Sequence, residues 1–270
     1  LPLKGKTRER GLILHPIFIC SKKTLNSAEP PPPPALPAGE RIYAIGDIHG
    51  RSDLLDRLLA LIEADLVGYE GQSRLVFLGD YIDRGPDSKG VLERMMGPLH
   101  GTLPPVFLLG NHEESFLGFF SDLAVGKGWL TYGGLATLAS YGIPFKGGSI
   151  APPERLQQLQ SDLVAQFPEA HRNFLAGMPT WFSSGDYYFV HAGVNPALPL
   201  DQQNDRDRLW IRHAFMDWKT PLEKMIVHGH SISDDVEIHS PRIGVDTGAY
   251  ASGRLTALVL EETRHRTLQT

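Results

Sequence analysis

The chain has 270 residues, of which 41% are hydrophobic and 21% charged, fractions typical of a globular protein with a full core. The formal net charge of -5 does not support general nucleic-acid binding, and we expect no stable nucleic-acid complex. The single cysteine, Cys20, excludes an intramolecular disulfide framework and is typical of a cytoplasmic protein. No apolar run reaches the ~18 residues that cross a bilayer, so we expect no membrane segment.

The N-terminal residues have the composition of a tail. The run Pro30–Pro34 favours an extended linker, and the short apolar stretch Leu12–Cys20 has no small-residue cleavage site of the kind that follows a secretory signal. We therefore predict a disordered, proline-rich tail at residues 1–39 and one folded domain at residues 40–270.

Apolar runs and helical patterns alternate in the first half of that domain. In chain order we predict a strand at Arg41–Ile45, a helix from an N-cap at Ser52 through Ile62, a strand at Arg74–Leu78, a helix from Asp87 or Ser88 through Met96, and a strand at Val106–Leu109. This alternation implies parallel strands with helices covering the sheet, and hence an α/β fold.

The second half of the domain begins with a different pattern. Residues from about 114 to 180 are rich in helical and loop patterns, and we interpret them as a helical insertion that forms one wall of a site. Strand patterns then return at Tyr187–Val190, Met225–Val227, Val236–Ile238 and Arg254–Leu260.

Clusters of carboxylate, amide and histidine side chains follow the predicted strands. They are Gly46-Asp47-Ile48-His49-Gly50, Gly79-Asp80-Tyr81-Ile82-Asp83-Arg84-Gly85 and Gly110-Asn111-His112-Glu113, with His191 and His230 after two later strands. Open α/β sheets bind ligands beyond the carboxyl ends of their strands, so we expect these side chains to converge.

The converging side chains are sufficient for two divalent metal ions. Two metals about 3.5–4 Å apart need a shared ligand, and Asp80 is the natural bridge. Asp47 and His49 would complete the first set, and Asn111, His191 and His230 the second. Mixed oxygen and nitrogen ligands favour manganese, with iron or zinc as alternatives, and the metals would activate a water as nucleophile.

These motifs resemble the phosphoprotein phosphatases of the calcineurin-like metallophosphoesterases, in their bacterial and phage branch of Ser/Thr protein phosphatases. The resemblance covers roughly residues 41–260 and implies a central β-sandwich of mixed sheets flanked by helices. It implies the same six metal ligands, a catalytic acid at His112 oriented by Asp83, and phosphate binding by Arg84, Arg212 and Asn111.

The chemistry of a phosphate ester explains these roles. A proton from His112 would stabilise the leaving oxygen, Asp83 would orient the imidazole and favour its charged form, and the planar fork of Arg84 can bind two phosphate oxygens.

Three functions are compatible with the sequence. Our first expectation is a metal-dependent phosphoserine or phosphothreonine protein phosphatase, acting on phosphoproteins or smaller phosphate monoesters. The alternative is a symmetrical dinucleoside-tetraphosphate hydrolase or another nucleotide phosphohydrolase, whose base pocket would use Trp129, Tyr132 or Tyr141. A less favoured possibility is an inactive module that binds partners through its proline-rich tail. The sequence leaves open the native metal pair, the physiological substrate and the oligomeric state.

Overall fold

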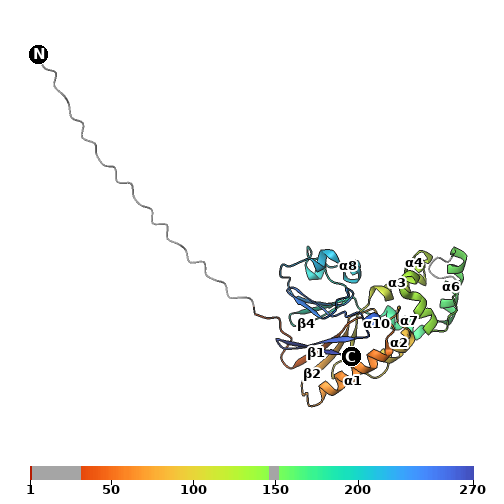
Figure 1. Ribbon diagram of the computed structural model, residues 1–270, viewed down its shortest axis with the longest axis horizontal. Coiled ribbons are helices and arrows are strands. Elements are labelled where there is room, and N and C mark those ends of the chain that lie inside the picture. The colour runs from red at the N-terminus through yellow and green to blue at the C-terminus, as the bar shows by residue number, and fades with distance from the viewer. Residues whose placement is uncertain (2–31, 146–151) are drawn as a thin grey trace. The chain divides into compact units, whose positions relative to one another are not determined.

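The computed structural model describes residue 1, residues 32–145 and residues 152–270 (Figure 1). The predicted tail lies outside the described residues up to residue 31. Its last part is packed on the domain, since Leu36 is only 4% exposed and the backbone N–H of Ala35 donates to Asp186 Oδ2 at 3.0 Å. The packed domain therefore begins before the expected boundary at residue 40.

Five strands form the first sheet, in the order β10-β9-β1-β2-β3. Their bounds are β1 Glu40–Ile45, β2 Gln72–Phe77, β3 Val106–Phe107, β9 Thr256–Glu261 and β10 Arg264–Gln269. Strands β1, β2 and β3 are parallel, as predicted, whereas β9 and β10 run antiparallel to their neighbours. The sequence analysis missed β10 because five of its six residues are charged or polar and exposed at a sheet edge, which removes the apolar alternation.

The second sheet also has five strands, in the order β4-β5-β6-β8-β7. Their bounds are β4 Trp181–Ser184, β5 Tyr187–Val190, β6 Met225–His228, β7 Glu237–His239 and β8 Arg242–Gly244. Strands β5, β6 and β8 are parallel, with antiparallel β4 and β7 at the edges. Both sheets are therefore mixed, as the resemblance to the calcineurin-like metallophosphoesterases implied.

The two sheets pack face to face around an apolar layer. Alternation along β1 shows how the sequence builds it, because Ile42 and Ala44 point into the layer between the sheets while Tyr43 and Ile45 point to the opposite face. The layer also contains Val76, Leu78, Leu108, Tyr187, Phe189, Val227, Ile243, Val245, Leu258 and Leu260.

Helices cover the outer faces of the sandwich (Figure 1). The first sheet is covered by α1 Ser52–Leu66, α2 Ser88–Met96 and the insertion, and their apolar side chains share one core with β1 and β2. The insertion comprises α3 Asn111–Phe119, α4 Leu123–Trp129, a distorted turn at Leu130–Gly134, α5 Leu135–Ser140, α6 Pro153–Gln166 and α7 Glu169–Ala176.

The segment after β5 covers the second sheet, with a short turn at Leu200–Gln202 followed by α8 Asp205–Trp210 and α9 His213–Met216. One further short helix, α10 Ala249–Ser252, follows β8. Ser52 is not the N-cap that we predicted, because it is the first residue of α1 and its hydroxyl donates to Asp87 Oδ2 at 2.6 Å.

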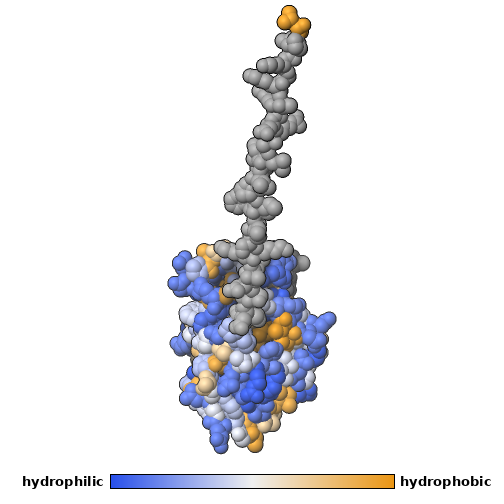
Figure 2. Space-filling model, turned by 90° about the vertical axis from the view of Figure 1, so that its left-hand side faces the viewer, coloured by the Kyte–Doolittle hydropathy of each residue, from blue (hydrophilic) through white to orange (hydrophobic). Residues whose placement is uncertain are grey.

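The surface shown in Figure 2 is mainly hydrophilic, with hydrophobic residues in separate small areas. In the part of the chain that the structure describes, no helix is long and apolar enough to cross a bilayer.

Candidate metal centre and active site

Every predicted metal ligand lies just beyond the carboxyl end of a parallel strand. Asp47 and His49 follow β1, Asp80 follows β2, Asn111 follows β3, His191 follows β5 and His230 follows β6. The parallel strands of both sheets thus contribute to the same place, which explains how ligands so far apart in the chain converge.

The backbone at this place adopts left-handed angles that side chains rarely take. Positive φ values occur at His49 (46°), Asp80 (54°), Asp83 (71°), Arg84 (66°) and His230 (61°). Such strain is typical of active sites, where the surrounding structure holds the side chains in place.

His49 is oriented by the backbone and stays neutral. Its Nδ1–H donates to Ile82 O at 2.8 Å, so its Nε2 faces Asp80 Oδ2 at 3.5 Å. Burial lowers the pKa of His49 to about 3, and the ring therefore presents a lone pair at neutral pH.

The second set of ligands brings acceptor atoms face to face. His191 Nδ1–H donates to Leu78 O at 2.8 Å, and burial lowers the pKa of His191, so its Nε2 carries a lone pair. That nitrogen lies 2.8 Å from Asn111 Oδ1, 3.4 Å from Asp80 Oδ1 and 3.2 Å from Nδ1 of His230. Burial also lowers the pKa of His230 to about 2. Lone pairs that converge in this way are stabilised by a cation.

Asp80 belongs to both ligand groups, as the sequence predicted for a bridge. One group is His49, Asp80 and His112, the other is Asp80, His191 and His230, and the ligand atoms within each group lie within 4.8 Å of one another. His112 belongs to the first group, although the prediction did not count it as a metal ligand, and it also contacts Asp83 and Arg84.

Asp47 lies beside a second buried carboxyl group, that of Asp246. Burial and the charges of Asp246 and Asp80 raise the pKa of Asp47 well above its usual range, and burial raises the pKa of Asp246 to about 6. The backbone N–H of His230 donates to both oxygens of Asp47 at 3.1 Å. Two adjacent buried carboxylates require a proton or a cation between them, so the donor set fits divalent metals.

His112 and Asp83 form a buried pair. His112 Nδ1–H donates to Asp83 Oδ2 at 2.7 Å. Burial lowers the pKa of His112, but the negative charges of Asp80 and Asp83 outweigh that effect and raise it above the usual value. Asp83 also accepts hydrogen bonds from Trp129 Nε1 at 2.9 Å and Thr137 Oγ1 at 2.6 Å. The insertion therefore helps to fix the carboxylate that orients His112.

Two of the three aromatic residues proposed for a base pocket are used structurally. Trp129 is 2% exposed and donates its indole N–H to Asp83, while Tyr141 binds His171 Nδ1 at 2.7 Å and packs against Phe167. That part of the prediction was wrong, because Trp129 is buried in the core of the insertion and Tyr141, which is partly buried, packs against that core. Tyr132 is 63% exposed and is free to contact a substrate.

Glu113 ties two of the ligand loops together. Its carboxylate accepts N–H groups from Asp80 at 2.9 Å, Tyr81 at 2.8 Å, Ile82 at 3.2 Å and Gly110 at 3.1 Å. The residue therefore acts on the loop backbone rather than on a substrate.

The two predicted phosphate-binding arginines lie near the ligands. Arg84 Nη2 donates to His112 Nε2 at 3.1 Å. Arg212 is exposed, and its charge contributes to the lowered pKa values of His191 and His230, which places it near the second ligand group.

Tyr250 is a site residue that the sequence analysis missed. Its ring centroid lies 5.4 Å from that of His49, a member of the first ligand group, and 4.8 Å from Arg84 Cζ. The only signal in the sequence was its position just after Asp246-Thr247-Gly248.

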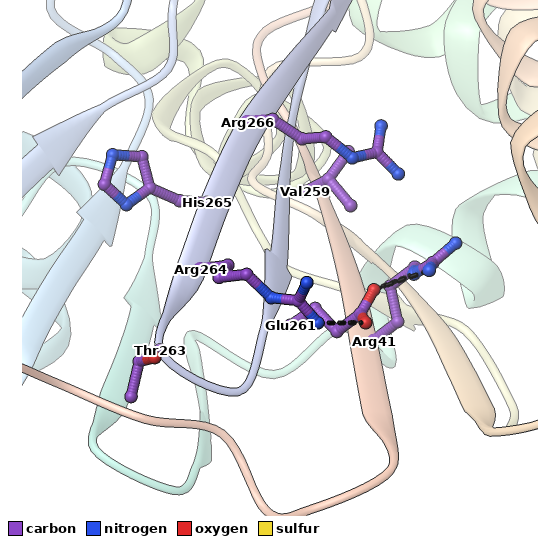
Figure 3. Close-up of a pocket in the computed structure, with 7 residues that line it drawn as sticks. All are labelled: Arg41, Val259, Glu261, Thr263, Arg264, His265 and Arg266. Carbon is purple, nitrogen blue, oxygen red and sulfur yellow. Dashed lines mark hydrogen bonds and ion pairs between the residues drawn. The ribbon is translucent and has the colours of Figure 1, made fainter.

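A cavity of about 550 Å³ lies away from this centre (Figure 3). It is lined by residues of β9, β10 and the start of β1, including Arg41, Glu261, Arg264 and Arg266. Arg41 lies near the amino end of β1, whereas the metal ligands follow its carboxyl end. The cations of the cavity are paired, since Arg41 and Arg264 bind Glu261 and Arg266 binds Asp65.

Comparison with known proteins matches this geometry. The pattern described as calcineurin-like phosphoesterase covers residues 40–252. A symmetrical bis(5'-nucleosyl)-tetraphosphatase of Acidovorax sp. (strain JS42) is 32% identical over 60% of this chain and 47% of its own length. Its counterpart in Methylococcus capsulatus is 31% identical over 58% and 44%. The chain thus spans about half the length of these curated relatives.

Two further matches extend over more of their own length. An asymmetrical bis(5'-nucleosyl)-tetraphosphatase PrpE of Anoxybacillus flavithermus is 24% identical over 79% of this chain and 88% of that protein. A solved structure, provisionally named a diadenosine tetraphosphatase, has a TM-score of 0.58 and 21% identity, covering 85% of this chain and 93% of that one. That likeness establishes the fold.

Proposed function

The chain belongs to the calcineurin-like phosphoesterase family of metal-dependent hydrolases, and we propose that its substrates are dinucleoside tetraphosphates. The observation that carries the hydrolytic part is the contact of His112 with both Asp83, at 2.7 Å, and Arg84, at 3.1 Å, while His112 also lies in one ligand group with His49 and Asp80. These contacts support our proposal that His112 is the proton donor and Arg84 the phosphate-binding fork beside the metals, an arrangement that phosphoryl transfer to water requires.

The metals would be held by Asp47, His49, Asp80, Asn111, His191 and His230. Two divalent ions in this position, manganese in our proposal, supply Lewis acidity and lower the pKa of water. Arg84 and Arg212 bind oxygens of the phosphate that is attacked, together with the amide of Asn111. His112 gives a proton from Nε2 to the leaving oxygen, and Asp83 keeps the ring oriented and charged.

The choice of substrate class rests on the relatives and on one residue of the insertion. The relatives described above are named as hydrolases of bis(5'-nucleosyl) tetraphosphates. Tyr132, 63% exposed, directly precedes Gly133, whose carbonyl accepts the backbone N–H of Arg84 at 3.2 Å. An exposed aromatic side chain on the turn that contacts the backbone of Arg84 is suited to stack a nucleobase, which contributes ~1–3 kcal/mol per base where such stacking occurs.

A phosphoprotein is the second candidate substrate, because the order of the motifs resembles that of the phosphoprotein phosphatases. An inactive binding module is not supported, since every predicted ligand, the acid and the phosphate-binding arginine are present. Both substrate classes use the same hydrolytic residues and differ in what surrounds the phosphate.

Parallel assays at one manganese concentration distinguish the two classes. We expect kcat/KM for diadenosine tetraphosphate to exceed that for a phosphoserine peptide by at least about 100-fold, a difference of ~2.7 kcal/mol in transition-state binding. Two ADP molecules would identify symmetrical cleavage, and ATP with AMP would identify asymmetrical cleavage. A preference for the peptide would contradict the proposal.

Tyr132→Ser tests the source of the preference. We expect it to lower kcat/KM for the dinucleotide about tenfold, because the stacking surface is lost, and to leave hydrolysis of para-nitrophenyl phosphate unchanged. Tyr69→Ser is the matched control, because Tyr69 stacks on Arg41 near the amino end of β1, away from the metal ligands.

A further inference from the structure

The Tyr250 ring contacts two residues of the proposed site, the metal ligand His49 and the phosphate-binding Arg84. Its ring meets the His49 ring edge-on, with centroids 5.4 Å apart at 85°, and Arg84 Cζ lies 4.8 Å from the Tyr250 centroid. The side chain is 36% exposed, so part of its surface faces solvent. The ring therefore forms a wall of the site on the side of the first ligand group.

The backbone that carries Tyr250 is anchored. Ala249 O accepts from Arg51 Nη1 at 3.0 Å, and the N–H of Gly248 donates to Asp246 Oδ1 at 2.8 Å. Ser252 Oγ donates to Thr247 O at 2.7 Å, which closes the same turn. Because the turn is fixed at both ends, the ring has a defined position before substrate arrives.

Arg84 has few other partners to fix its guanidinium. Among the residues that the structure describes, none of its nitrogens lies within 4.0 Å of a carboxylate oxygen. Its contacts are the Tyr250 ring and the bond from Nη2 to His112 Nε2. A long side chain loses rotamer freedom when it is ordered, so a planar surface that holds it beforehand improves binding.

We propose that Tyr250 is a positioning residue, whose ring holds the guanidinium of Arg84 for binding of the substrate phosphate. The inference rests on the proposed role of Arg84 but does not depend on which phosphate compound is hydrolysed. Attraction between a cation and an aromatic face is of a size that changes phosphate affinity by about three- to tenfold.

Binding of inorganic phosphate to the manganese-loaded protein tests the proposal without any turnover. We expect calorimetry to show a phosphate Kd about three- to tenfold higher for Tyr250→Leu, which removes the aromatic face, and within about twofold of the unchanged protein for Tyr250→Phe, which keeps it. Tyr250→Met is a second aliphatic variant if the leucine variant does not fold. Tyr69→Leu removes the cation–π partner of Arg41 and should leave phosphate affinity unchanged.

A double-mutant cycle separates action through Arg84 from any other effect. In an Arg84→Ala background, Tyr250→Leu should add nothing to the loss of phosphate affinity. An equal loss in both backgrounds, an equal loss in Tyr250→Phe, or loss of bound manganese from Tyr250→Leu would overturn the proposal. Failure to cleave dinucleotides would contradict the proposed substrate class and leave these phosphate affinities as an independent result.

Discussion

Replacing His112 by Asn separates acid catalysis from metal binding. The backbone N–H of residue 112, which donates to Asp80 Oδ1 at 3.1 Å, is retained in the variant. Asp83 keeps its bonds to Trp129 at 2.9 Å and Thr137 at 2.6 Å, so one of three side-chain donors is lost. We therefore expect two metals per chain and a loss of ~1–3 kcal/mol in the free energy of unfolding.

The catalytic loss should depend on the leaving group. For an alkyl ester such as phosphoserine, whose leaving alkoxide is strongly basic, we expect turnover to fall by about 10²–10⁴, or ~3–5.5 kcal/mol of transition-state stabilisation. Para-nitrophenolate and the ADP released from a dinucleoside tetraphosphate are much weaker bases. Their release needs less proton transfer, so the loss should be smaller for both.

The assay compares kcat of the variant and the unchanged protein on these three substrates at saturating manganese, with metal content measured by elemental analysis. Equal losses on all three substrates would refute the acid role, because proton donation cannot be indifferent to the leaving group. Loss of manganese from the variant would instead assign His112 to the first metal.

Other changes test separate parts of the site. Asp80→Asn should remove most of both metals in elemental analysis, because an amide lacks the charge and second anionic oxygen of a bridge, while Asp47→Asn should mainly empty the first position. Asp83→Asn should shift the alkaline limb of the kcat profile to lower pH, because Asp83 raises the pKa of His112 and the acid loses its proton as pH rises through that pKa. An alkaline limb at the same pH in the variant would argue against the pair. A chain that begins at residue 38 should melt about 5 °C below one that begins at residue 32, because it lacks buried Leu36, and equal melting temperatures would contradict that packing.

The types of side chain in the site could be predicted because they belong to short local sequence patterns. Asp47, Asp80 and Asn111 each follow an apolar run that ends in glycine, and the alternation of such runs with helical patterns is typical of parallel strands. Gly79 shows why glycine stands at these ends, since a Cβ there would lie 2.7 Å from His191 Nδ1 and 2.8 Å from Gly110 Cα. Residue types and strand order therefore predicted that Asp80 would belong to both ligand groups, although the first group contains His112 where the prediction had Asp47.

Contacts between distant segments decided the rest. Tyr250 had no local signal, because its importance comes from Arg84 and His49, which lie more than 160 positions earlier in the chain. From the sequence, Trp129 was equally compatible with stacking on a nucleobase and with a place in the core. The structure decides for the core, because its indole nitrogen lies 2.9 Å from Asp83. Strand β10 could not be predicted because this edge strand shows no apolar alternation. The packing of Leu36 could not be predicted because the burial of one leucine depends on the distant surface that it contacts. Local sequence thus determined which groups stand at the strand ends, and the tertiary structure determined which side chains orient them.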